Sequence, residues 1–282
     1  MKIAIISEDD FGFSKGLERT NHDVSLYGCS SINDLCRDVS GGYRPDCIFL
    51  MEDGRVPPAF WDKNNIESHF DFSPTLVYFT RECLEPTDSD LKKIGSSDLV
   101  LTQNMHLISD LAFNDVNVFR FPYWADTSVF FSTDSPKTYD CVSSTSNLEV
   151  ANKFESALSS KGLSFLNKPI CDPDFLNSGK VFLNFEEKVV VPRAFFEASA
   201  CGLPILSSHL NECSVIESLL EEEREILYFS SLDECVSRAY LYARHERERR
   251  VVARKSFYLI EKYHTIEKRV RKFIKEIKIL KL

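Results

Sequence analysis

Short apolar runs recur along the whole chain, and the segments between them carry polar residues at helical spacing. The runs are three to five residues long and rich in β-branched and aromatic side chains, which is typical of strands buried in a sheet. Strands that alternate with helices in this way predict mostly parallel sheets with helices on both faces, joined by right-handed crossovers. The predicted strands are Ile3–Ile6, Val24–Tyr27, Cys47–Met51, Leu76–Phe79, Leu99–Thr102, Val116–Phe119, Tyr139–Val142, Ser164–Leu166, Val181–Phe185, Ile205–Ser207 and Leu227–Phe229.

The strand series is interrupted once, near residues 125–137, where turn formers are frequent and periodicity is weak. We therefore predict an α/β fold of two doubly wound, Rossmann-like domains, residues 1–130 and 131–282, joined by an ordered linker. Ser231 followed by Glu234 has the spacing of a capping box. It predicts the start of a helical tail that runs with few interruptions to the end of the chain.

One segment of the second domain, residues 181–207, is more informative than the rest. It reads as a strand, a loop, a short helix and a second strand. Pro192 suits the first helical position, where a missing N–H has no cost, and Gly202 followed by Pro204 is a usual helix stop. The pattern predicts a helix from Pro192 to Cys201.

This helix carries a cation and an anion near its N-terminal end, Arg193 and Glu197, one turn apart on one face. A helix N-terminus attracts anions, an arginine beside it can grip a diphosphate with two bonds, and a carboxylate can accept bonds from ribose hydroxyls. The arrangement indicates a nucleotide-sugar site. The alternative from residue types alone is a surface ion pair worth about 0.2–0.5 kcal/mol.

The same segment resembles the group-1 glycosyltransferases of GT-B fold, and most closely their spore-maturation-like (CgeB-like) branch. The resemblance implies that Glu197 binds the ribose of the sugar-nucleotide donor and that Arg193 lies close to its phosphates. Larger relatives carry a second glutamate eight residues before the first, where this chain has Val189. The residues that carry the resemblance are Arg193, Phe196, Glu197, Ala198, Ala200, Cys201, Gly202, Pro204 and Ile205.

Further donor contacts are expected from loops of the second domain. Ser143 and Ser144 follow a predicted strand where the family often has glycine, and their hydroxyls and N–H groups can approach a phosphate. Asn184 and Lys188 flank the loop before the key helix and are candidates for binding the base or a phosphate.

The catalytic group is expected from the first domain, at the carboxyl ends of its strands. Arg81 and Glu82 directly follow a predicted strand, where Arg81 could stabilise charge on the leaving phosphate and Glu82 could orient an acceptor hydroxyl. Asp10 follows the first strand and could act as a general base, and Asp53 is a further candidate. Each of these residues could instead serve as a helix cap or lie in a solvated turn.

We predict no metal site and no cofactor besides the nucleotide sugar. Asp88-Ser89-Asp90 and Asp172-Pro173-Asp174 have the spacing that metal-dependent transferases use. The first is better explained as a helix start and the second as a proline turn. The nine cysteines include no C-x-x-C pair, and the six histidines are scattered, so we expect reduced thiols and no zinc.

Charge is unevenly distributed in this chain of net charge −9. Residues 244–282 hold 14 Lys and Arg against five Glu, so the tail carries +9 and the remainder −18. The tail is either a solvated helix face or the part that meets an anionic partner. No apolar run approaches the length of a membrane span, and the N-terminus does not resemble a signal peptide, so we expect a cytoplasmic protein.

The sequence therefore predicts a metal-independent, retaining glycosyltransferase that moves a sugar from a nucleoside-diphosphate donor to an acceptor hydroxyl. The acceptor could be a glycan, a small molecule, a protein or modified DNA. Two alternatives remain. One is a transferase acting on hydroxymethylated DNA bases, for which the basic tail would bind phosphates. The other is a non-catalytic sugar-nucleotide-binding module.

Overall fold

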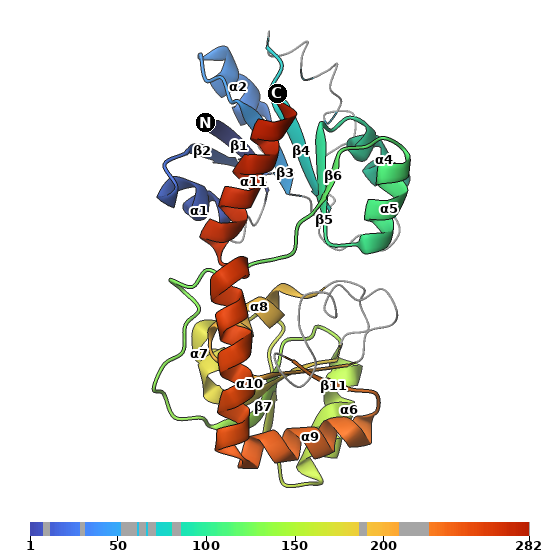
Figure 1. Ribbon diagram of the computed structural model, residues 1–282, viewed down its shortest axis with the longest axis vertical. Coiled ribbons are helices and arrows are strands. Elements are labelled where there is room, and N and C mark those ends of the chain that lie inside the picture. Colours follow the sequence, from blue (N-terminus) through green and yellow to red (C-terminus); the bar gives the residue numbers. More distant parts are fainter. Residues whose placement is uncertain are drawn as a thin grey trace. The chain divides into compact units, whose positions relative to one another are not determined.

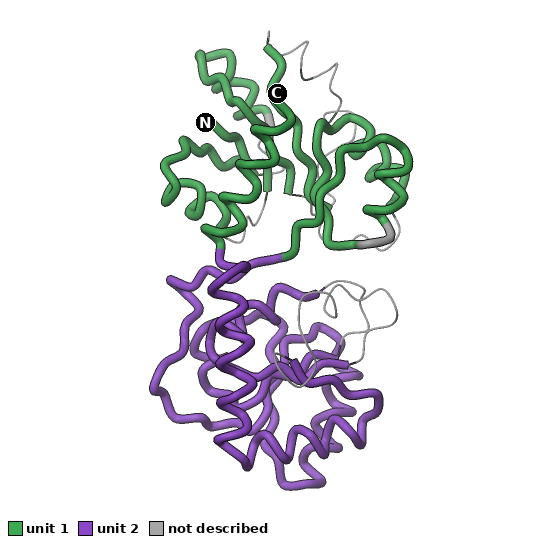
Figure 2. The backbone as a smooth tube through the Cα atoms, in the orientation of Figure 1, with its two compact units in different colours: residues 1–122, 266–282 green, residues 123–265 purple. Residues whose placement is uncertain are grey.

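The protein is described by a computed structural model in which the chain divides into two compact units (Figure 2). Unit 1 comprises Met1–Pro122 and Ile266–Leu282, and unit 2 comprises Tyr123–Thr265. No helix in the described ranges is long and apolar enough to cross a membrane. The structure describes residues 1–7, 12–28, 32–51, 61, 66, 72–80, 86–185, 191–208 and 226–281, with only the backbone for 32, 105 and 106.

Unit 1 is built on a six-stranded parallel sheet with the order β2-β1-β3-β4-β5-β6 (Figure 1). Its central strands are buried along their whole length, as expected for a parallel sheet covered on both faces. The strands are β1 (Lys2–Ile6), β2 (Asp23–Tyr27), β3 (Cys47–Met51), β4 (Thr75–Thr80), β5 (Leu99–Thr102) and β6 (Val118–Arg120). The helices are α1 (Phe13–Arg19), α2 (Ile32–Ser40), α4 (Asp88–Gly95), α5 (Met105–Phe113) and the last helix of the chain, α11 (Ile266–Leu280).

The two faces of this sheet have different cores. On one face, α2, α4 and α5 pack through aliphatic side chains on alternate residues of the strands. On the other, Phe13 of α1 and Phe273 of α11 lie against Phe49 and Phe121, with ring centroids 4.8–6.4 Å apart. Helices α1 and α11 meet at Gly16, where an added Cβ would lie 2.7 Å from an Ile266 side-chain atom. This close approach requires a residue without a side chain.

Unit 2 is built on a five-stranded parallel sheet with the order β11-β10-β9-β7-β8. Helices α6 and α9 share a hydrophobic core with one face of the sheet, and α8 packs on β9 and β10. The strands are β7 (Tyr139–Ser143), β8 (Phe165–Asn167), β9 (Gly179–Asn184), β10 (Ile205–Ser208) and β11 (Leu227–Phe229). The helices are α6 (Leu148–Ser159), α7 (Pro173–Ser178), α8 (Arg193–Ala200), α9 (Leu232–Arg244) and α10 (Glu246–Leu259), followed by the π-helix η1 (Ile260–His264).

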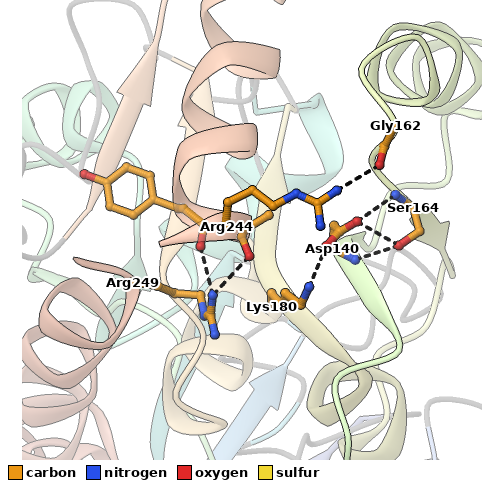
Figure 3. Close-up of polar contacts among 8 residues, drawn as sticks. Asp140, Gly162, Ser164, Lys180, Arg244 and Arg249 are labelled. Atoms are coloured by element: carbon orange, nitrogen blue, oxygen red, sulfur yellow. Dashed lines mark hydrogen bonds and ion pairs between the residues drawn. The ribbon is translucent and has the colours of Figure 1, made fainter. Parts of the chain in front are cut away.

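A polar network fixes the amino ends of β7 and β9 in unit 2 (Figure 3). Lys180 donates to Asp140 at 2.7 Å, and Asp140 also accepts bonds from the backbone and side chain of Ser164. Burial raises the pKa of the Asp140 carboxyl, but these hydrogen bonds outweigh it and the net pKa is lowered. Nearby, Arg249 donates to two carbonyls at the end of α9, and Arg244 donates to the Gly162 carbonyl. The network lies opposite the carboxyl ends of the strands and is structural.

The predicted fold class is confirmed, and every predicted strand is present with bounds shifted by at most two residues at either end. The predicted helical tail is also present, interrupted at His245 and Thr265. Ser231 caps α9 as predicted, but Glu234 accepts from the Ser230 N–H instead of completing the capping box with Ser231.

The division of the chain differs from the predicted one at residues 130/131. The boundary falls after Pro122, and Ile266–Leu282 groups with unit 1. The physical reason is the apolar face of α11, whose buried side chains include Val270, Phe273 and Ile277 and pack beside α1. Helix α11 therefore docks on the core of the first sheet.

Candidate functional site

The candidate site is the edge of the unit 2 sheet at which its parallel strands end. Polar residues occupy the carboxyl ends of three adjacent strands: Ser143 on β7, Asn184 on β9 and Ser207 on β10. All three are buried. In open parallel α/β sheets, ligands bind outside the carboxyl ends of the strands. The same edge also holds the N-terminus of each helix that follows a strand.

Helix α8 follows β9 and contributes its N-terminal end to this edge. The structure begins α8 at Arg193 and ends it at Ala200, one residue inside the predicted Pro192–Cys201 at each end. Pro192 is the N-cap, with an extended ψ of 149°, and not the first helical residue as predicted. Within the described residues, no side chain caps this N-terminus. Gly202 stops the helix with φ of 73°, as the sequence predicted.

The interior side of α8 is fixed by aromatic packing. Phe195 and Phe196 are each 1% exposed, and the ring of Phe196 lies 5.2 Å from that of buried His264 at the end of η1. The helix also contacts α10. Because its apolar face is held on two sides, α8 presents its first turn at the strand edge in a defined orientation.

Arg193 and Glu197 form an ion pair on α8, with the Arg193 Nε 2.5 Å from the Glu197 Oε1. The pair has the predicted i, i+4 spacing but is not a surface pair. The Glu197 side chain is only 4% exposed, whereas that of Arg193 is 31% exposed. Burying a carboxylate carries a desolvation penalty of several kcal/mol that an ion pair seldom repays fully. The buried Glu197 carboxylate therefore adds no net stability to the fold. A buried charge that does not stabilise the fold is typical of a binding residue.

The loop between β8 and α7 brings a cysteine to the same place. Burial raises the pKa of Cys171 to about 12; a hydrogen bond with Ser144 opposes this shift, and the nearby charge of Glu197 adds to it. Burial, then the charge of Glu197, also raises the pKa of Cys201 to about 12. Both thiols are therefore neutral near pH 7. Ser144 and Glu197, from two other segments, therefore both lie near Cys171.

The other predicted donor residues have internal partners. The Asn184 amide donates to the Ser207 hydroxyl at 2.9 Å, which ties the ends of β9 and β10 together. Ser143 is the last residue of β7 instead of a loop residue, and its carbonyl accepts from the Lys168 N–H. Ser144, one residue further, is the first residue outside the strand.

Several predicted residues lie outside the described part of the chain. They are the catalytic candidates Asp10, Arg81, Glu82 and Asp53, the donor candidate Lys188, and Val189. Their roles stay predictions.

Both Asp-x-Asp sequences lie at helix starts, as predicted for the first, whereas the second was predicted to be a proline turn. Asp90 completes a capping box with Thr87 at the start of α4, and it also accepts from the Tyr78 hydroxyl at 2.8 Å. Asp172 caps α7 by accepting from the Phe175 N–H at 2.7 Å. Within the described ranges, no group of three His, Cys, Asp or Glu is placed to hold a metal ion. The six cysteines in those ranges are free thiols.

Sequence reasoning missed two residues of this edge, Cys171 and Ser207. Ser207 had a usable signal, because it ends a predicted strand that neighbours β9 in the βαβ order. Cys171 had none, since the loop that carries it approaches Glu197 only through the pairing of β8 with β7.

Comparisons with known proteins agree with this architecture. A family model described as "Glycosyl transferase-like" matches residues 172–275, which include the candidate helix. The curated proteins contain no match. Among solved structures, Anabaena Alr3699/HepE in complex with UDP and glucose has a TM-score of 0.68 at 11% identity, with 99% of each chain covered.

Two other solved structures are similar over the same length. Sucrose-phosphate synthase from Thermosynechococcus elongatus has a TM-score of 0.68 at 8% identity, with 99% of each chain covered. An alpha-glucosyltransferase in complex with UDP-glucose and DNA containing an abasic site has a TM-score of 0.62 at 10% identity, again with 99% of each chain covered. The chain thus has the two-domain α/β fold of the GT-B glycosyltransferase structures.

Proposed function

We propose that this protein is a glycosyltransferase that moves a sugar from a UDP-sugar to an acceptor hydroxyl. The observation that carries the proposal is the Arg193–Glu197 pair: a buried carboxylate and a partly exposed guanidinium on the first turns of α8, at the carboxyl edge of a parallel sheet. The family match over residues 172–275 and the fold shared with UDP-complexed structures support it.

In this proposal the diphosphate of the donor binds at the N-terminus of α8 beside Arg193. The uncapped N–H groups and the helix dipole attract an anion, and the guanidinium can form two parallel bonds to it. Glu197 accepts hydrogen bonds from the ribose hydroxyls. When the bond from the anomeric carbon to the diphosphate oxygen breaks, the negative charge that develops on the leaving group is stabilised by the same donors.

We further propose that transfer needs no metal ion and retains the configuration of the anomeric carbon. Metal independence is supported by the two Asp-x-Asp sequences, in which Asp90 and Asp172 make capping contacts at the starts of α4 and α7. Retention is supported only by the resemblance of the 193–205 motif to the group-1 family. Activity that persists in EDTA, and a product whose anomeric proton shows the donor's configuration by NMR, test these two points separately.

The decisive experiment is a panel of nucleoside diphosphates and their sugars, read first by thermal shift and then by released nucleoside diphosphate. UDP and a UDP-sugar should raise the melting temperature, because a ligand that binds only the folded state stabilises it. Slow hydrolysis of the same donor should follow and should be lost in Glu197→Ala. Hydrolysis that Glu197→Ala leaves unchanged would refute the site assignment. Binding without any turnover would favour the non-catalytic module instead.

A further inference from the structure

The exposed face of α10 in unit 2 carries a groove lined by basic residues. The groove has a volume of about 680 Å³. The helix contacts α8 and α9 with its opposite side, so this face is directed away from the unit's core (Figure 1). The described residues that line the groove are Glu246, Arg247, Arg250, Val251, Arg254 and Lys255.

The cations of this groove are mostly uncommitted. Arg250 pairs with Glu246 across one helical turn. Arg247, Arg254 and Lys255 are exposed, and no described carboxylate lies within ion-pair distance of them. The lining carries a net charge of +3, whereas the whole chain carries −9. An anionic partner is therefore attracted to this face and repelled from residues 1–243, which carry −18.

Two exposed tyrosines continue the same surface toward the end of the helix. Tyr258 is 60% exposed and lies one turn beyond Arg254. Tyr263 is 51% exposed, and the Lys262 ammonium lies 4.7 Å from its ring centroid and 5.9 Å from that of Tyr258. Exposure of large aromatic rings to water is unfavourable in free energy. A partner whose planar rings stack on them would remove this exposure. Guanidinium groups followed by aromatic rings form the combination that binds phosphates and stacks bases.

We propose that this face of α10 is a binding surface for single-stranded nucleic acid. The arginines at 247, 250 and 254 recur at three- and four-residue spacing, so they form a row along the helix that suits a chain of phosphates. The tyrosines suit unstacked bases, which a duplex does not offer. A groove is concave and Arg-rich, so it fits a strand better than the flat surface of a membrane. The surface is distinct from the strand edge, and the proposal does not rest on the donor reaction.

The test compares two variants that lose the same charge from unit 2. Arg247→Gln/Arg254→Gln removes two uncommitted cations of the groove. Lys153→Gln/Lys161→Gln removes two exposed cations on and after α6 and is the matched control. Binding of a labelled single strand is measured by fluorescence anisotropy across a salt titration, with the same-sequence duplex and phosphatidylserine vesicles as parallel probes. Melting temperatures, with and without UDP, show that each variant is folded and report on the donor site independently.

We expect the wild type and the lysine control to bind the single strand alike. The arginine variant should bind more weakly, and the slope of log affinity against log salt should be smaller by about 1.4, which is two phosphate contacts. Tyr258→Ala should weaken binding about fivefold or more without changing that slope. Equal loss in both double variants, no binding at low salt, duplex bound as tightly as single strand, or vesicles bound in preference to the oligonucleotide would each overturn the proposal.

Discussion

Replacing Glu197 by glutamine tests whether the buried carboxylate of α8 is a binding group. Glutamine has the same shape and can still bond Arg193, but it carries no charge. Arg193 is 31% exposed, so its cation remains in contact with solvent after the change. We therefore expect the melting temperature of the free protein to change by only a few degrees, while the response to UDP falls sharply.

The size of that fall follows from the hydrogen bonds that Glu197 would make to the ribose. Bonds to a charged group contribute about 1.5–3 kcal/mol, so their loss weakens binding about 10- to 150-fold. At a UDP concentration of about 100 times the wild-type Kd, ligand stabilises the wild type by about 2.7 kcal/mol. A variant weakened about 100-fold gains only about 0.4 kcal/mol. In a domain of this size, the thermal shift should drop from about 5–10 °C to about 1 °C.

The control is Glu246→Gln, which removes the glutamate of another i, i+4 pair in the same unit. Glu246 pairs with Arg250 as Glu197 pairs with Arg193, but its side chain is 58% exposed and lies on α10. The UDP-induced shift should be unchanged in this variant. If Glu197→Gln keeps the full shift while its fold is intact, then the carboxylate does not contact the donor and the reasoning from its burial is wrong.

Three further predictions address the arginine, the polar network and the helix contact. Arg193→Lys should keep the ion pair but lose the two-bond grip on a diphosphate, so UDP affinity should fall at least about tenfold while uridine affinity, measured by calorimetry, stays constant. Asp140→Asn should lower the free energy of unfolding by about 2 kcal/mol at pH 7 because it weakens the bond from Lys180. Since the folded-state pKa of Asp140 lies below its ordinary 3.8, the wild-type advantage is complete well above pH 3.8 and should begin to shrink as the pH falls below that value, which urea melts from pH 7 to pH 3 would show. Gly16→Ala should destabilise unit 1 by about 1–3 kcal/mol because its Cβ would overlap α11, whereas Gly95→Ala, with open space around it, should not; equal melting temperatures for these two variants would contradict the packing argument.

The strands could be predicted because a parallel sheet buries them on both faces, which leaves an uninterrupted apolar run. Cys47–Met51, Leu99–Thr102 and Leu227–Phe229 match their predicted bounds for this reason. The docking partner of α11 could not be predicted. Its amphipathic pattern shows which side chains are buried, such as Phe273, but not which sheet they meet. That depends on the aromatic face of the sheet at Phe49 of β3, which the sequence does not link to the tail.

The candidate site was predictable only along one helix. The spacing of Arg193 and Glu197 fixed their pairing, because i, i+4 residues share a face. Their unequal burial could not be predicted from the sequence, since it arises from packing of α8 between the sheet and η1. The approach of Cys171 depended on strand order, which a local pattern does not encode. Sequence therefore located the candidate pair on one helix, and tertiary packing determined its environment.

The ion pair of α8 is consistent with a donor site because it keeps both charges in place without a ligand. Glu197 is 4% exposed, and its buried charge would be uncompensated without Arg193, 2.5 Å away. A diphosphate that binds the exposed side of Arg193 leaves the Nε contact intact, because the guanidinium has five N–H donors and this contact uses one. The arginine can thus bind the carboxylate and a phosphate together, and the carboxylate remains charged and oriented to accept ribose hydroxyls. A lysine at 193 could bind the carboxylate or the phosphate, but not both in a fixed geometry. Arg193→Lys should therefore weaken binding of the diphosphate, whereas Glu197→Gln should weaken binding of the ribose.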